Sequence, residues 1–199
     1  MSTPKDLLIV ALQDGGPVTQ GELSLGLAAA ELIDLLQVPA ARLDGGRIVP
    51  GRLPGPADPL LEEAAAAFVT DDPYEPVDDW LWRRGEGLAA TYLDALEADG
   101  TLERRGGRPL REGERVLTDS PARRQASDRR DGREPVLLTL AEIVGLADGS
   151  DGRDRPKVTD YAVERVLGAA EEAVQELEAE RQRRLIEQAA YDNIWRVPE

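Results

Sequence analysis

One segment near the N-terminus has a pattern that, in a helix, is apolar around most of the circumference. Thr19 and Glu22 have the S/T-x-x-E spacing of a capping box, and Pro39 ends the pattern, which predicts a helix over Thr19–Val38. Its polar residues fall on one narrow stripe, at Gln20, Ser24, Glu31, Asp34 and Gln37. Such a helix is buried on most sides, and at this length it is about 28 Å long. We therefore expect it to be the central and most buried element.

The 199-residue chain contains no histidine and no cysteine. Serine and cysteine triads need an imidazole, and zinc and iron sites nearly always use His or Cys ligands. The adjacent acids Asp71-Asp72 and Asp78-Asp79 are poor catalytic pairs, because neighbouring residues rarely face one another and Asp in such places more often caps a helix. We therefore expect no enzyme, no metal and no cofactor.

Charge is distributed unevenly along the chain. The net charge is −15, but residues 101–133 hold ten arginines against six acids, a local balance of +4 that leaves −19 elsewhere. This Gly- and Pro-containing segment is interpreted as a solvated loop or, alternatively, as an arm for anion contact or self-association. The acidic balance opposes binding to a phosphate backbone, so we expect no nucleic-acid partner.

Shorter patterns predict the remaining elements of the first half. The apolar run Lys5–Leu12 predicts a short helix or a strand. Ala41–Val49 predicts a β-hairpin around Asp44-Gly45-Gly46. Asp58 is placed to cap a helix with Pro59 in its first turn. Asp78 or Asp79 is expected to cap the Trp-containing helical segment that runs to Ala98, where Gly100 closes it.

In the second half, residues 101–103 and 115–117 are expected to pair as a hairpin around Gly106-Gly107. Pro135–Leu146 predicts an apolar helix. Thr159 or Asp160 starts the last helix, whose apolar face is Val163, Leu167, Ala170, Val174 and Leu177. We expect Tyr191, Ile194 and Trp195 to dock on the body of the protein. Together these elements predict a mainly α fold with short β-hairpins.

Composition also bears on location. No stretch approaches the roughly 20 apolar residues of a membrane span. The run Leu7–Leu12 is short and lacks the basic flank and cleavage site of a secretory signal. The absence of cysteine implies no disulfide framework. We expect a soluble cytoplasmic protein, and the strong preference for Arg over Lys indicates a GC-rich bacterial genome.

An ordered set of motifs points to a family. The set is Asp6–Leu12, Leu25–Leu35, Ala41–Arg47, Asp58–Leu61, Trp80 and Leu96–Leu102. In this order it resembles the Golgi phosphoprotein 3 family and its bacterial relatives, most closely over residues 5–103. The resemblance implies a single domain over residues 1–199, in which a central helix bundle is ringed by amphipathic helices and carries a protruding β-hairpin.

The resemblance also implies a function. Eukaryotic members are peripheral Golgi proteins that bind phosphatidylinositol 4-phosphate and help retain membrane glycosyltransferases. Their phosphate pocket has a Trp and an Arg on the long helix and two Arg on the Trp-containing segment. The matching positions here are Thr19, Ala28, Glu86 and Ala89, none of which is Trp or Arg.

A nearby cluster offers a substitute for the missing pocket residues. Trp82, Arg83 and Arg84 lie one turn before Glu86 and form the candidate lipid-headgroup site. The alternative interpretation makes Trp80 and Trp82 core or boundary aromatics and the two arginines solvated. In both cases we expect exposed guanidinium groups, so that replacing them should barely change stability.

The sequence thus predicts a non-enzymatic, peripheral membrane-type binding module for an anionic phospholipid headgroup, at the inner face of the membrane. Binding of lipid is expected to be weak and salt-sensitive. The alternative is a cytoplasmic scaffold that acts through protein partners without lipid. Self-association through a hairpin is a further possibility that the sequence leaves open.

Overall fold

The computed structural model describes residues 2–15, 18–55, 58–105, 114–146 and 157–194, with the side chains of residues 114, 190 and 192–194 excluded. More than half of the chain is helical, and the strands of the described residues form two separate two-stranded antiparallel sheets. The mainly α fold with short hairpins is therefore confirmed. The elements in chain order are α1 Thr3–Asp14, α2 Gln20–Leu36, β1 Ala41–Asp44, β2 Arg47–Pro50, α3 Pro59–Ala66, α4 Val77–Gly85, α5 Leu88–Ala98, β3 Leu102–Arg105, β4 Glu114–Leu117, α6 Pro121–Asp131, α7 Pro135–Ile143 and α8 Tyr161–Ile194.

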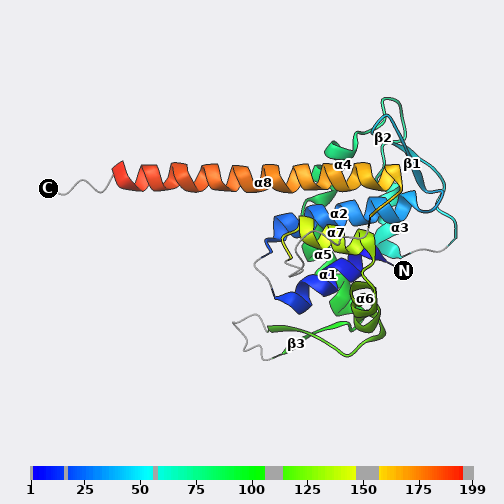
Figure 1. The fold of residues 1–199 in the computed structure, drawn as a ribbon, viewed down its shortest axis with the longest axis horizontal. Helices are drawn as coiled ribbons and strands as arrows, with labels where there is room; N and C mark the ends of the chain where they lie inside the picture. The colour runs from blue at the N-terminus through cyan, green and yellow to red at the C-terminus, as the bar shows by residue number, and fades with distance from the viewer. Residues whose placement is uncertain (1, 16–17, 56–57, 106–113, 147–156, 195–199) are drawn as a thin grey trace.

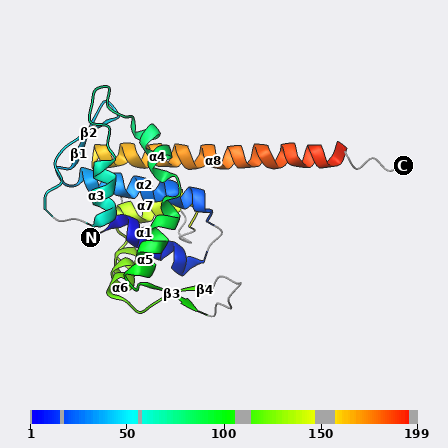
Figure 2. The same ribbon diagram turned by 180° about the vertical axis from the view of Figure 1, so that it is seen from behind.

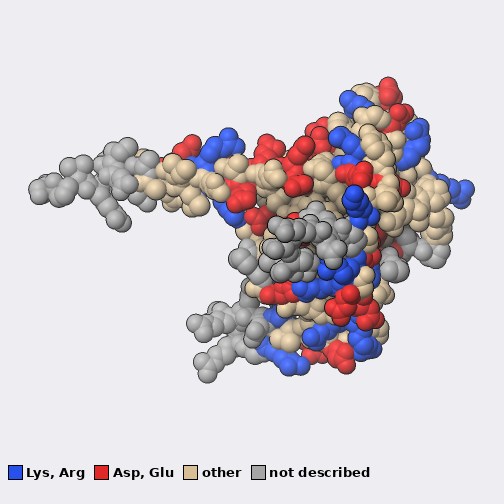
Figure 3. Space-filling model, viewed as in Figure 1, with Lys and Arg blue, Asp and Glu red and all other residues tan. Residues whose placement is uncertain are grey.

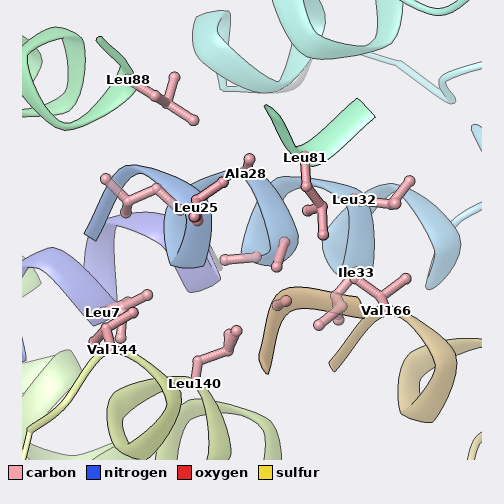
Figure 4. Close-up of a cluster of buried hydrophobic side chains, with 14 of the residues drawn as sticks. Leu7, Leu25, Ala28, Leu32, Ile33, Leu81, Leu88, Leu140, Val144 and Val166 are labelled. Atoms are coloured by element: carbon pink, nitrogen blue, oxygen red, sulfur yellow. The ribbon is translucent and has the colours of Figure 1, made fainter. Parts of the chain in front are cut away.

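Helix α2 is the centre of the molecule. It packs against α1, α4, α5 and α8, and Figures 1 and 2 show α8 running beside it in both views. Side chains from α1, α4, α7 and α8 converge on it in the core, among them Leu7, Leu81 and Leu140 (Figure 4). Leu32 and Ile33 are completely buried. The expected central position of this helix is confirmed.

Local signals fix the ends of several elements. The Thr19–Glu22 capping box is present in both directions, with the Glu22 carboxylate accepting from the Thr19 N–H at 2.9 Å. The apolar run near the N-terminus is helical rather than extended, as α1. Gly45 and Gly46 both have positive φ in the turn between β1 and β2, a conformation that Gly adopts at little cost. Asp58 caps α3 through the Leu60 N–H.

The expected cap of α4 is wrong. Neither Asp78 nor Asp79 precedes this helix, because both lie in its first turn and Pro76 occupies the cap position. The Val77 N–H is instead bonded to the Gly46 carbonyl at 3.1 Å. The β1–β2 turn therefore satisfies the first free N–H of α4, and the two aspartates lie in its first turn, where the helix dipole favours negative charge.

The arginine-rich segment is not a simple loop. Leu102 pairs with Leu117 in the β3–β4 hairpin, as expected, while its Gly106-Gly107 turn lies outside the described residues. Helix α6 follows, in place of the solvated loop that the charge pattern indicated. Ser120 caps it, Pro121 occupies its first turn, and Gly132 ends it. The presumed breakers thus mark the two ends of a helix.

Helix α8 has a buried part and a projecting part. Asp160 caps it through the N–H groups of Ala162 and Val163. Its first half packs on α2 and α4, and its second half extends away from the body (Figure 1). Tyr191 is 62% exposed there, so its expected docking is wrong. The apolar face of the helix gives way to Arg, Gln and Glu beyond Leu177. Trp195 lies outside the described residues.

Candidate binding site

A pocket of about 410 Å³ opens where α2, α4, α5 and α8 meet. We call it the helix-junction pocket. Its walls are the first turns of α2, the corner between α4 and α5, and one leucine of α8. The described residues that line it are Gln20, Gly21, Ser24, Leu25, Trp82, Gly85, Glu86, Gly87, Ala89, Ala90 and Leu177. Most are small or apolar, so the pocket offers an apolar surface with few polar groups.

Small residues allow these helices to approach one another. A Cβ on Gly21 would lie 2.8 Å from Cδ2 of Leu177, so a larger residue there would push the Leu177 side chain aside where α8 crosses α2. Gly87 has a φ of +70° at the corner between α4 and α5. Beside it, Ser24 Oγ accepts the N–H of Ala89 at 3.0 Å and fixes the start of α5 to α2. The Ser24–Ala89 hydrogen bond therefore joins two helices of the pocket floor.

The three residues of the predicted headgroup site are not brought together at this pocket. Trp82 lines it and is 40% exposed. Arg83 faces the other way, with Nε and Nη2 each 2.7 Å from the Glu75 carboxylate and its guanidinium 5.3 Å from the centre of the Trp80 ring. Trp80 itself is completely buried. Of the cluster, the structure places one aromatic side chain at the pocket.

Arg84 is held inside the protein. Its Nε donates to one oxygen of Glu31 at 2.7 Å and its Nη2 to the other at 3.0 Å, while Nη1 donates to Glu63 at 2.7 Å. The Arg84 side chain is 10% exposed and Glu31 is completely buried. The expectation of two exposed guanidinium groups is therefore wrong for Arg84. Its partner was not predicted, because Glu31 lies 53 residues earlier in the chain.

Tyr92 completes this buried network. Its hydroxyl donates to Glu31 at 2.9 Å. Burial raises the pKa of Tyr92, and the nearby Glu31 carboxylate raises it further, so the hydroxyl stays a donor. Burial also raises the pKa of Glu31, against the hydrogen bonds from Arg84 and Tyr92 that lower it. For Arg84, burial lowers the pKa, but the hydrogen bonds to Glu31 and Glu63 outweigh it and leave the pKa raised.

The four positions that match the family's phosphate pocket lie in different places in the structure. Glu86 and Ala89 line the helix-junction pocket. Thr19 caps α2 beside Gln20, which also lines it. Ala28 is completely buried in the core. Among the described lining residues none is Lys or Arg, and Glu86 is the one that carries a charge. The sequence comparison pointed to this place, but α8's contribution through Leu177 was not foreseen.

The fold and the pocket define a helical module built around one buried helix, with a mostly apolar pocket at a helix junction. The model of the Golgi phosphoprotein 3 (GPP34) family matches residues 4–189 of the chain. The chain belongs to this family, and the match extends well beyond the motifs of its first half. No curated protein and no solved structure matches the chain. None of the described helices has the length and apolar character that crossing a membrane requires.

Proposed function

We propose that this chain is a non-enzymatic binding module that acts through protein partners, and that its helix-junction pocket receives an apolar side chain flanked by a cation. The observation that carries the proposal is the pocket lining, which combines an apolar floor with Glu86 as its charged group. A phosphate group needs guanidinium or ammonium donors. Glu86 would repel it, whereas it would attract a lysine or arginine of a partner.

The other charges of the molecule support the same choice. The net charge of −15 favours encounter with cationic partners over anionic ones. Arg84, the nearest buried cation on α4, is already bonded to Glu31 and Glu63. Releasing it to a ligand would leave a fully buried carboxylate unpaired, which is costly. The family's role in retaining membrane glycosyltransferases fits a pocket for short segments of other proteins.

Trp82 suits the rim of such a pocket. Partly exposed tryptophans are frequent anchors of protein interfaces, since they bury a large apolar area and lose little conformational freedom. Trp82 and Glu86 both line the pocket, so one partner segment can contact both. The headgroup hypothesis assigned the same residue to a lipid. The two functions therefore differ in the charge of the ligand, which an experiment can vary.

The test uses a short peptide with one leucine between two arginines, and a matched peptide in which glutamates replace the arginines. Isothermal titration should detect the basic peptide and not the acidic one. Glu86→Lys should weaken binding of the basic peptide by about tenfold or more. Asp78→Lys is the matched control, because Asp78 is an exposed acid of α4 that does not line the pocket, and it should change affinity little.

Vesicles containing phosphatidylinositol 4-phosphate test the competing hypothesis, that the protein binds a lipid headgroup. If the lipid hypothesis holds, the protein should float with such vesicles at low salt and Trp82→Ala should abolish flotation. Preference for the acidic peptide, or flotation that depends on Trp82 without any peptide binding, would refute the protein-partner function.

A further inference from the structure

A second concave surface lies between the end of α1, strand β4 and helix α6. It encloses about 600 Å³, and three arginines, Arg115, Arg123 and Arg130, line it together with Gln13 and Ser127. We call it the arginine groove. It has no lining residue in common with the helix-junction pocket. Figure 3 shows blue atoms of Lys and Arg interspersed with red ones over α6 and the adjoining hairpin.

Two of the arginines are held in place by acids. Arg115 donates to Glu97 through Nε, and the same carboxylate also accepts from Arg104 at 2.8 Å. These hydrogen bonds lower the pKa of Glu97, which keeps the acid ionised. Arg130 pairs with Asp14 at the end of α1. Each of these guanidinium groups has five N–H donors, so the pairing positions the group and leaves further donors available.

Arg123 differs from its neighbours. Its side chain has no ion pair and no hydrogen bond within the described part of the chain, although the residue is only partly exposed. Its backbone is in ordinary helical surroundings, since its N–H bonds to Ser120 Oγ and its carbonyl accepts from Ser127 Oγ. The adjacent Arg124, in contrast, is exposed and paired with Asp119. A guanidinium that no described acceptor engages keeps its N–H donors available for an anion.

The polar groups around it fit the same kind of ligand. Gln13 Nε2 donates to Ser127 Oγ at 3.1 Å, which holds both side chains at the groove. An amide nitrogen has two hydrogens, so Gln13 keeps one for a ligand. Asp131 is the acid among the described lining residues, and it is exposed to solvent, where its repulsion is screened. Because Glu97 and Asp14 offset the charges of Arg115 and Arg130, Arg123 is the lining arginine that no acid among the described residues pairs with.

We propose that the arginine groove binds a phosphate-bearing anion, with Arg123 as the principal contact and Arg115 and Arg130 as supporting donors. The ligand is either a free phosphorylated small molecule or the phosphate of a lipid headgroup, which share this chemistry. The site gives a role to the arginine-rich segment of an otherwise acidic chain. It is independent of the helix-junction pocket and of the function proposed for that pocket.

The test is a titration of the whole protein with inorganic pyrophosphate at low salt. Nuclear magnetic resonance monitors the amide signals of α6 during the titration. The wild type should bind, and added salt should weaken binding. Arg123→Ala should weaken it by about tenfold or more. Arg124→Ala is the control on the same helix and should bind as the wild type does. Arg123→Lys keeps the charge but loses the fork, so its affinity should lie between the two.

Vesicles of phosphatidylcholine with and without phosphatidic acid distinguish the sources. Arg123-dependent flotation with phosphatidic acid identifies a lipid phosphate, and pyrophosphate binding without flotation identifies a free one. Two results would overturn the proposal. One is a wild type that binds neither pyrophosphate nor phosphatidic acid vesicles at low salt. The other is an Arg123→Ala variant that binds as tightly as wild type. Because Arg123 has no ion pair with any described residue, this variant should also melt at the wild-type temperature.

Discussion

Arg84 and Glu31 meet through two parallel hydrogen bonds of 2.7 and 3.0 Å, with the carboxylate completely buried. The pair ties α4 to the central helix α2, and Tyr92 adds α5 to the same carboxylate. Removing one member of a buried pair leaves the other charge without a partner in a poorly solvated place. The network therefore fixes the helices around the pocket and keeps the Arg84 guanidinium out of it.

Because of this pair, Arg84 should contribute more to stability than the adjacent Arg83. Arg84→Ala should lower the free energy of unfolding by about 3–5 kcal/mol, because it leaves Glu31 unpaired. Arg83→Ala should cost less than Arg84→Ala, because the Arg83 side chain is 45% exposed and water can take its place beside Glu75, which is 9% exposed. Urea denaturation of the two variants measures both values. Equal, small losses would show that the buried pair is not formed.

A double-mutant cycle isolates the pair itself. Glu31→Gln and Arg84→Met should each destabilise the protein, and the double variant should lose less than the sum of the two. The difference should be about 0.5–3 kcal/mol, the range for residues in one network. Strict additivity in denaturant titrations would contradict direct coupling between Arg84 and Glu31.

Two leucines test the division between core and projecting helix. Leu32 is completely buried on α2, while Leu185 is 61% exposed on the projecting part of α8. Leu32→Ala should cost about 2–5 kcal/mol, and Leu185→Ala should stay within about 0.5 kcal/mol. Thermal unfolding followed by circular dichroism compares them. A large loss for Leu185→Ala would mean that α8 packs against something along its second half.

The charge distribution predicts the response to nucleic acid. Apart from residues 101–133 the chain carries −19, so duplex DNA should not bind at physiological salt. Fluorescence anisotropy with a random duplex measures this. A submicromolar complex would contradict the electrostatic argument and would point to the arginine groove as the contact.

The parts of the fold that could be predicted from sequence have local causes. The Thr19–Glu22 capping box, the Gly45-Gly46 turn and the apolar periodicity of α2 and α8 each depend on residues close together in the chain. Helix α6 was missed because Ala126 is its one buried residue. It is held by ion pairs to α1, including Arg129 with Asp6 at 2.6 Å. Such contacts, across more than a hundred residues, leave no periodic signal.

The candidate site shows the same limit. Two of the four positions that the family resemblance singled out, Glu86 and Ala89, line the pocket, whereas Ala28 is buried in the core. The partners of Arg84 and the position of Leu177 depend on how α2, α4 and α8 pack. A charged side chain beside a tryptophan looks the same in sequence whether it meets solvent, a ligand or a buried acid. Only the tertiary structure distinguished these.

The most direct test of the proposed function is an amide correlation spectrum of the Arg123→Ala variant, recorded with each ligand in turn. This variant removes the principal contact of the arginine groove. The basic leucine peptide should shift the amide signals of Gly21, Gly85 and Gly87, which line the helix-junction pocket. Inositol 1,4-bisphosphate, the soluble form of the lipid headgroup, should leave them in place. Shifts of these three glycines with the phosphate and not with the peptide would contradict the account.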